Sequence, residues 1–198
     1  NIQTVDEWQN AHDRIVNELQ KRTFAAFPEP VPLQPRLEFR TLDGGLYGKN
    51  VYSFVSEADW RLKVDIRYRQ PQHHTSGLMI VLRNAGEPRW ASEGFISGLS
   101  DDGNIAYVEL RGAGEAGWAP ELQWHIRRAA AWTGRTVASM QVYDLLRTIE
   151  FVKTLQGVDP QRIGIAARDE MGAVALYAAL FNGNVHSLIL QAPPESQN

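Results

Sequence analysis

The sequence has 198 residues, a formal net charge of −3 and acidic and basic residues interspersed along its length. This charge pattern provides neither a basic face for nucleic acid nor a polybasic patch for a membrane surface, so we expect neither partner. The absence of cysteine excludes disulfides, thiolate metal sites and a cysteine nucleophile. Hydrophobic residues make up 43% of the chain, which is enough for the core of one ordinary globular domain.

Residues 1–36 are predicted to form a helix followed by a proline-rich crossing segment. Thr4 and Glu7 have the spacing of a capping box, and apolar residues then recur on one helical face. The prolines between residues 28 and 35 force an extended conformation that cannot belong to a central strand. We therefore expect an N-terminal segment, 1–36, and a following α/β domain, 37–198.

Residues 37–69 have a pattern that is typical of antiparallel strands. Residues 37–42 and 50–55 are predicted to be two strands joined by a turn. Residues 62–68 alternate strictly between apolar and charged side chains, so one face of this strand is buried and the other is solvated. Such a strand favours an antiparallel position near the edge of a sheet.

From residue 78 onward, apolar strands alternate with helices, which predicts a parallel sheet with right-handed crossovers. The expected strands are 78–82, 105–110, 162–167 and 185–190, and the expected helices are 90–99, 142–155 and 172–180. Residues 118–134, rich in tryptophan and arginine, are predicted to be an irregular insertion over the C-terminal ends of the strands. The predicted fold class is α/β, a three-layer αβα sandwich with a mostly parallel sheet.

Several segments of the second half resemble the α/β-hydrolases, nearest to the acetyl xylan esterase and prolyl-oligopeptidase-like esterase branch. The segments that carry this resemblance are Arg111–Glu115, Gly134–Thr136, Val142–Leu155, Val158–Gly164 and Ala175–Ala179. The family writes its nucleophile elbow G-x-S-x-G, between a buried strand and a helix. By this resemblance Ala167 takes the place of the first glycine, Asp169 that of the serine and Met171 that of the second glycine.

Three departures from the family pattern predict a degenerate elbow in an incomplete domain. Asp169 replaces the serine, and the loop Arg83–Gly86 replaces the H-G-G-like oxyanion loop of the family. The sequence also ends at Asn198, after what corresponds to the sixth strand of the family, so the segments that normally bring the acid and the histidine are expected to be missing. We therefore expect an α/β-hydrolase-like domain truncated after that strand.

Two residues are candidate catalytic groups. Asp169 can act as a carboxylate nucleophile, as in dehalogenase and epoxide-hydrolase relatives, which form an ester that an activated water cleaves. The alternative is a polar turn in which its charge faces solvent. His125 could overhang the elbow and pair with Asp169, or it could be a surface histidine. The sequence offers no metal-ligand spacing, and we expect neither a metal nor a cofactor.

Candidate substrate-binding residues lie at strand ends and in the tryptophan-rich stretch. They are Arg83, Asn84, Arg111, Glu115, Trp118 and Trp124. The charged residues among them could hold an anionic substrate at the edge where α/β sheets bind ligands, or could pair internally and order the loops. The tryptophans could stack on sugar rings or bury against a neighbouring domain.

The predicted function is that of a carbohydrate-esterase-like domain, catalytically degenerate on its own, with a structural or binding role in a larger esterase. One alternative is an active ester hydrolase that uses Asp169 or is completed by residues outside this chain, and another is a carbohydrate-binding module. The partners expected are a glycan or acetylated carbohydrate and, because the incomplete sheet would leave an edge uncovered, an adjacent domain or a homodimer partner. The resemblance alone favours a secreted or periplasmic location.

Overall fold

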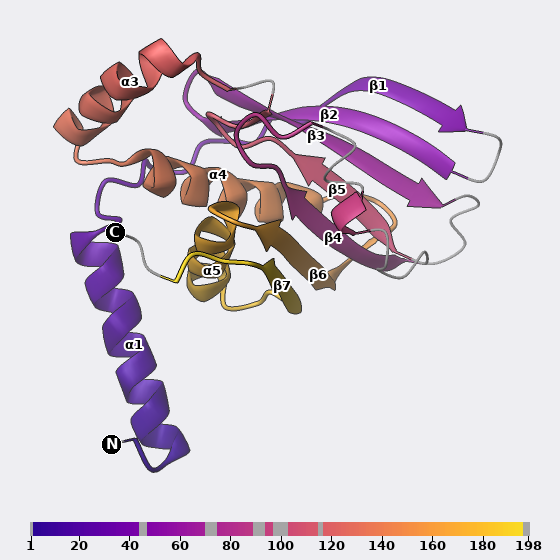
Figure 1. The fold of residues 1–198 in the computed structure, drawn as a ribbon. Coiled ribbons are helices and arrows are strands. Elements are labelled where there is room, and N and C mark those ends of the chain that lie inside the picture. The colour runs from indigo at the N-terminus through magenta and orange to yellow at the C-terminus, as the bar shows by residue number, and fades with distance from the viewer. Residues whose placement is uncertain are drawn as a thin grey trace.

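The computed structural model describes residues 2–43, 47–69, 75–88, 94–96, 103–114 and 117–195, which form a seven-stranded sheet with helices packed on it (Figure 1). The strands are β1 (Arg36–Asp43), β2 (Tyr47–Glu57), β3 (Trp60–Arg69), β4 (Ser76–Leu82), β5 (Asn104–Val108), β6 (Val158–Arg168) and β7 (Ser187–Gln191). The helices are α1 (Val5–Arg22), α3 (Pro120–Trp132), α4 (Val137–Val152) and α5 (Met171–Asn182). The predicted α/β class is confirmed.

The sheet has the order β1-β2-β3-β5-β4-β6-β7 and is mixed. Pairing is antiparallel from β1 through β3 to β5, and parallel from β5 through β4 and β6 to β7. Five strands, β2, β5, β4, β6 and β7, therefore share one direction, while β1 and β3 run against it. The predicted predominance of one strand direction is confirmed.

The antiparallel pairing predicted for residues 62–68 is confirmed, whereas the position predicted near the edge of the sheet is not, because two strands lie outside them. These residues belong to β3, which lies between β2 and β5 and pairs with both. Its alternation does reflect one buried face, since Leu62, Val64 and Ile66 are buried. The two preceding strands extend the sheet beyond it, and β1 is the edge strand.

Helices α4 and α5 cover one face of the sheet and enclose the main hydrophobic core. Thr136 and Ser139 cap the start of α4 reciprocally, and the apolar stripe of this helix places Val142, Leu145 and Ile149 in the core. Strand β4 supplies Ile80, which is fully buried, as expected for a strand covered on both faces.

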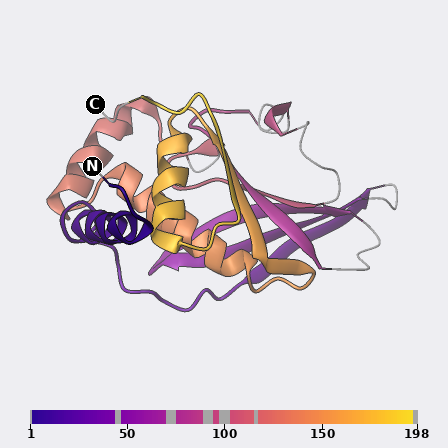
Figure 2. The ribbon, with the colours of Figure 1, turned by 90° about the horizontal axis from the view of Figure 1, so that it is seen from below.

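A smaller cluster lies on the opposite face, where Ile96 packs with Val81, Tyr107 and Ala166. Figure 2 shows the short helical turn at residues 94–96 on one side of the sheet and α4 on the other side. Most of the helix predicted at 90–99 lies outside the described residues.

The N-terminal segment begins as predicted and then joins the core. The capping box between Thr4 and Glu7 is present, and α1 continues to Arg22. Phe24 is buried against the aromatic rings of α5. In the extended segment that follows, the Leu33 carbonyl accepts a hydrogen bond from the Val55 N–H. Residues 24–33 thus pack on the same body as the strands, and the division at residue 36 stays a prediction.

The expectation of an irregular insertion at 118–134 is wrong, because residues 120–132 form the regular helix α3. Pro120 stands in its first turn with Glu121, positions that suit a helix start, and alanines follow. Figure 1 shows α3 beyond the end of the sheet toward which β4 and β5 point. Ala130 is the only buried residue of this helix, and the helix contacts α4. Within the described ranges, none of the helices is both long and apolar enough to cross a membrane.

Candidate functional site

The elbow between β6 and α5 is present, and Asp169 stands at its apex. Asp169 has φ of 49°, in the left-handed region that residues other than glycine, asparagine and aspartate rarely adopt. Its N–H donates to the Gln191 carbonyl at 3.0 Å, and its carbonyl accepts from the Gly172 N–H at 2.9 Å. The side chain of Asp169 is exposed. The local geometry is therefore that of a sharp strand–turn–helix connection with an outward-facing carboxylate.

The glycine that allows close packing at this elbow lies one residue later than the sequence pattern implies. Met171, at the place of the second glycine, is buried, with 4% of its surface exposed. At Gly172 an added Cβ would lie 3.0 Å from Cβ of Pro193 and 3.3 Å from its Cα. The segment after β7 thus passes directly against the start of α5, and Gly172 leaves room for it.

The loop after β4 is tied to the elbow by polar contacts. The side-chain oxygen of Asn84 accepts a hydrogen bond from the Met171 N–H at 3.4 Å. The Glu87 carboxylate accepts from the Asn84 N–H at 2.9 Å and from the Asn84 side-chain amide at 3.1 Å, and it also pairs with Arg168 at 2.5 Å. Glu87 was not among the predicted site residues, because nothing in its sequence neighbourhood relates it to Arg168, which lies 81 positions away.

Arg83 and Glu109 form an ion pair at the adjacent carboxyl ends of β4 and β5. Arg83 is buried, with 6% of its surface exposed, and its guanidinium lies 5.6 Å from the centre of the Tyr107 ring. Among the described residues, Nε and Nη2 of Arg83 have no hydrogen-bond partner. The internal pairing that the sequence left open for Arg83 exists with Glu109, while Glu115 lies outside the described residues. Binding of a substrate by Arg83 and Asn84 stays a prediction.

Arg111, in the loop that follows β5, belongs to a buried ionic network. Its Nε and Nη2 donate to the two carboxylate oxygens of Asp144 at 2.8 and 2.6 Å, and Nη1 pairs with Glu57 at 3.0 Å. Ser56 donates a further hydrogen bond to Asp144 at 2.6 Å. Arg135 completes the network through two contacts with Glu57, at 2.6 and 2.9 Å. These contacts occupy the guanidinium of Arg111 and fix the loop after β5 to α4 and β2.

The electrostatics of this network favour its charged form. Burial alone would lower the pKa of Arg111, but its hydrogen bonds to Asp144 and then to Glu57 outweigh that effect, and its pKa lies above the ordinary value. The hydrogen bond from Arg135 is the main reason that the pKa of Glu57 lies below its usual range. Both groups therefore stay ionised at neutral pH.

The tryptophans near this region have different environments. The Trp118 ring is half-buried and lies over Gly112, where an added Cβ would be 2.9 Å from it. Gly112 has φ of 79°, so the close approach and the backbone conformation both require glycine. Trp124 on α3 is 58% exposed, and the Arg128 guanidinium lies 4.4 Å from its ring centre.

The structure does not join the two predicted catalytic residues. His125 is exposed on α3 and lies edge-on to Trp124 at 5.2 Å. No hydrogen bond or ion pair joins Asp169 to a histidine in the described part of the chain. The same part contains no group of three or more histidine, aspartate or glutamate side chains that could hold a metal ion. His73 and His74 lie outside it.

Two surface hollows lie away from the elbow. One, of about 320 Å³, runs along the C-terminal half of α1. The other, of about 400 Å³, lies where β3 ends and β5 begins, at the end of the sheet opposite the elbow, and includes Tyr47, Lys49 and Arg67.

Together, the strand order, the elbow after β6 and the loops at the carboxyl ends of β4 and β5 define a partial α/β-hydrolase fold. No family model matches the sequence, and no curated protein matches it either. Solved structures do match, and several of them are esterases.

A putative acetyl xylan esterase from Bacteroides fragilis NCTC 9343 matches with a TM-score of 0.77 and 10% identity, over 92% of this chain and 53% of that one. A glucuronoyl esterase from Solibacter usitatus matches with a TM-score of 0.70 and 12% identity, over 94% of this chain and 59% of the other. Acetyl xylan esterase 1 from Thermoanaerobacterium sp. JW/SL YS485 matches with a TM-score of 0.65 and 14% identity, over 89% of this chain and 56% of the other.

These matches confirm the structural resemblance to acetyl xylan esterases at low sequence identity and extend it to glucuronoyl esterases. The chain spans between 53% and 59% of the length of these three proteins. What it shares with them is therefore part of a fold.

Proposed function

We propose that this chain is a catalytically degenerate esterase-like module with a structural or binding role, in which the elbow serves as architecture. The observation that carries the proposal is the contact of a carboxylate, that of Glu87, with a backbone N–H of the loop beside the elbow. The Glu87 carboxylate accepts from the Asn84 N–H, and the Asn84 side chain accepts from the Met171 N–H.

The contact between Glu87 and the Asn84 N–H opposes the chemistry of ester cleavage. In α/β-hydrolases the oxyanion hole consists of the backbone N–H after the nucleophile and an N–H from the loop that corresponds to the loop after β4. An oxyanion needs donors that are aimed at it before the reaction. Here a carboxylate lies against the Asn84 N–H, and its negative charge would repel a developing oxyanion.

The nucleophilic step also lacks support among the described residues. A carboxylate nucleophile forms an ester that must be hydrolysed by water, and a positioned base has to activate that water. Asp169 has no histidine partner in the part of the chain that the structure describes. Its exposure is consistent with a solvated turn.

A turnover assay tests the proposal. The purified chain is incubated with a chromogenic acetyl ester beside the Asp169→Asn variant, which keeps the size and the left-handed tolerance of the side chain. We expect both proteins to hydrolyse the ester no faster than a buffer control. Turnover by the unmodified chain that the substitution abolishes would refute degeneracy and support an active hydrolase with Asp169 as nucleophile.

Glycan binding is a second candidate role, favoured by the exposed indoles of α3. Trp124 is 58% exposed and Trp132 is 85% exposed, and an indole face can stack on the apolar face of a sugar ring. Titration with acetylated xylan fragments should then quench tryptophan fluorescence, and Trp124→Ala should reduce the quenching. An unchanged spectrum at saturating fragment would leave only the structural role.

A further inference from the structure

Helix α1 stands clear of the rest of the protein over most of its length. Figure 1 shows it joined to the body at its C-terminal end and directed away from the sheet. None of its residues is buried, and the exposed fractions are 80% at Val5, 52% at Trp8 and 53% at Ile15. Leu19, near the body, does pack against the hydrophobic core. The helix thus carries apolar side chains that its own chain leaves largely in water.

These apolar side chains, together with His12, form one continuous stripe. Val5, Trp8, His12, Ile15 and Leu19 follow one another at intervals of three and four residues, which is the spacing of the core positions in a two-helix coiled coil. An amphipathic helix gains its stability in proteins mainly by burying such a stripe. The spacing therefore fits a second helix as the covering element.

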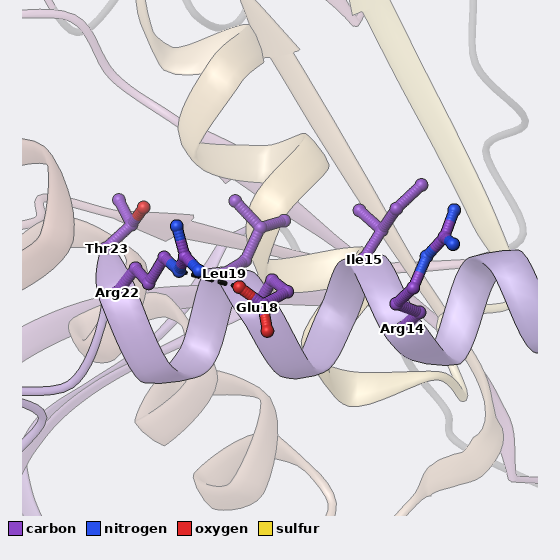
Figure 3. A pocket seen from close by; sticks show the side chains of 6 residues that line it. All are labelled: Arg14, Ile15, Glu18, Leu19, Arg22 and Thr23. Carbon is purple, nitrogen blue, oxygen red and sulfur yellow. Dashed lines mark ion pairs between the residues drawn. The ribbon is translucent and has the colours of Figure 1, made fainter.

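The two halves of α1 carry different surface features. The C-terminal half carries the hollow of about 320 Å³, lined by Arg14, Ile15, Glu18, Leu19, Arg22 and Thr23. Figure 3 shows Ile15 and Leu19 pointing to the same side of the helix, beside the Arg22–Glu18 ion pair. The N-terminal half carries the bulky, half-exposed Trp8. A two-fold rotation would bring the Trp8 end of one helix onto the hollow of another.

The charges of α1 are also divided between its two halves. The acidic residues Asp6, Glu7 and Asp13 lie in its N-terminal half, whereas Arg14, Lys21 and Arg22 lie in its C-terminal half together with Glu18. Two such helices side by side in parallel would place like charges together. In antiparallel orientation the acidic half of each faces the basic half of the other, which favours that orientation at moderate salt.

We propose that α1 binds a second copy of this chain, with the two α1 helices antiparallel about a two-fold axis between Asp13 and Arg14. The stripe then places Trp8 opposite Leu19 of the partner subunit, at the hollow. Asp6 lies level with Lys21 of the partner subunit. Each body is attached at the C-terminal end of its own α1, so the two bodies lie at opposite ends of the helix pair. This inference does not depend on the proposed function of the elbow.

Sedimentation velocity over a wide range of protein concentration tests the pairing. The unmodified chain should pass from monomer to dimer as concentration rises, and Trp8→Ala should weaken the dimer by about tenfold or more, because buried tryptophans dominate interface energies. Trp124→Ala on α3 is the matched control, since that side chain is similarly exposed, and it should leave the dimer unchanged. A chain that remains monomeric at every concentration overturns the proposal and leaves the stripe to another domain or protein.

A charge exchange tests the orientation. Asp6 and Lys21 are fifteen residues apart, about 22 Å along one helix, so they do not contact each other within a copy. We expect Asp6→Lys and Lys21→Glu each to weaken the dimer by about fivefold, as two symmetric surface pairs are lost, and the double variant to recover most of the loss. Circular dichroism of each variant checks that α1 stays helical. Losses that simply add in the double variant would rule out the antiparallel register.

Discussion

The buried carboxylate of Asp144 provides the sharpest test of what stabilises this fold. Asp144 is fully buried and accepts hydrogen bonds from Ser56 Oγ at 2.6 Å and from Arg111 at its N–H, Nε and Nη2, at 3.2, 2.8 and 2.6 Å. Asp144→Asn keeps the shape of the side chain but removes its charge. It also turns one oxygen into an amide group that would face donors of Arg111 or Ser56.

The expected loss of stability in Asp144→Asn follows from the partners that remain for Arg111. Arg111 would stay buried, at 6% exposure, with Glu57 as its only carboxylate partner among the described residues. Removing one partner of a buried ion pair costs about 3–5 kcal/mol, a large part of the roughly 5–15 kcal/mol that stabilises a typical domain. If the free energy of unfolding falls by about 2 kcal/mol for each molar of urea, the urea concentration at the unfolding midpoint should fall by about 2 M.

Urea unfolding followed by tryptophan fluorescence and far-UV circular dichroism measures this change. Glu29→Gln, at an exposed acid of the crossing segment, is the control and should change the unfolding free energy by less than about 0.5 kcal/mol. A loss below about 1 kcal/mol for Asp144→Asn, with the urea dependence unchanged, would refute the reasoning. It would mean that Arg111 finds other partners or water in the folded state.

Substitutions at two further positions test other parts of the structure. Because the Arg135 hydrogen bond lowers the pKa of Glu57, the pair stabilises the protein above the ordinary glutamate pKa, and this stabilisation is lost as the pH falls through the lowered pKa of the folded state. Glu57→Gln should therefore be less stable at neutral pH and lose less of its stability on acidification, and parallel pH profiles in urea unfolding would contradict this. At the elbow, Asp169→Gly should be more stable than Asp169→Ala by about 1 kcal/mol. The φ of residue 169 is 49°, and in this left-handed conformation the Cβ of alanine crowds the backbone, whereas glycine has no Cβ. Equal melting temperatures of the two variants would show that the turn relaxes.

Local signals in the sequence predicted the parts of the fold that neighbouring residues determine. The Thr4–Glu7 capping box, the stripe of the helix before β6 and the strand–turn–helix at Asp169 all depend on residues within a few turns of one another. Short-range hydrogen bonding and periodic burial are sufficient to specify such elements. The structure confirms each of them.

Long-range contacts explain what the sequence did not predict. Residues 62–68 have the alternation of a half-buried strand, but that pattern does not say how many strands pair beyond it, and β1 and β2 do. Glu87 reaches Arg168 across 81 positions, and Asp144 reaches Arg111 across 33 positions. The helix α3 was not predicted because its arginines and tryptophans are exposed. Its sequence therefore lacks the apolar stripe that identifies a packed helix.

The elbow shows why architecture and chemistry have to be argued separately. A parallel strand that passes directly into a helix on one face of the sheet needs a sharp turn, and a left-handed residue at its apex provides one. Aspartate tolerates this conformation better than most residues, so φ of 49° at Asp169 requires no catalytic selection. Close packing requires only Gly172 beside Pro193. The connection itself accounts for both features, whereas the Asn84 N–H, one of the donors that catalysis would need, is held by Glu87. Strain at this turn therefore indicates how the sheet is connected, and the identity of the groups around it is what bears on activity.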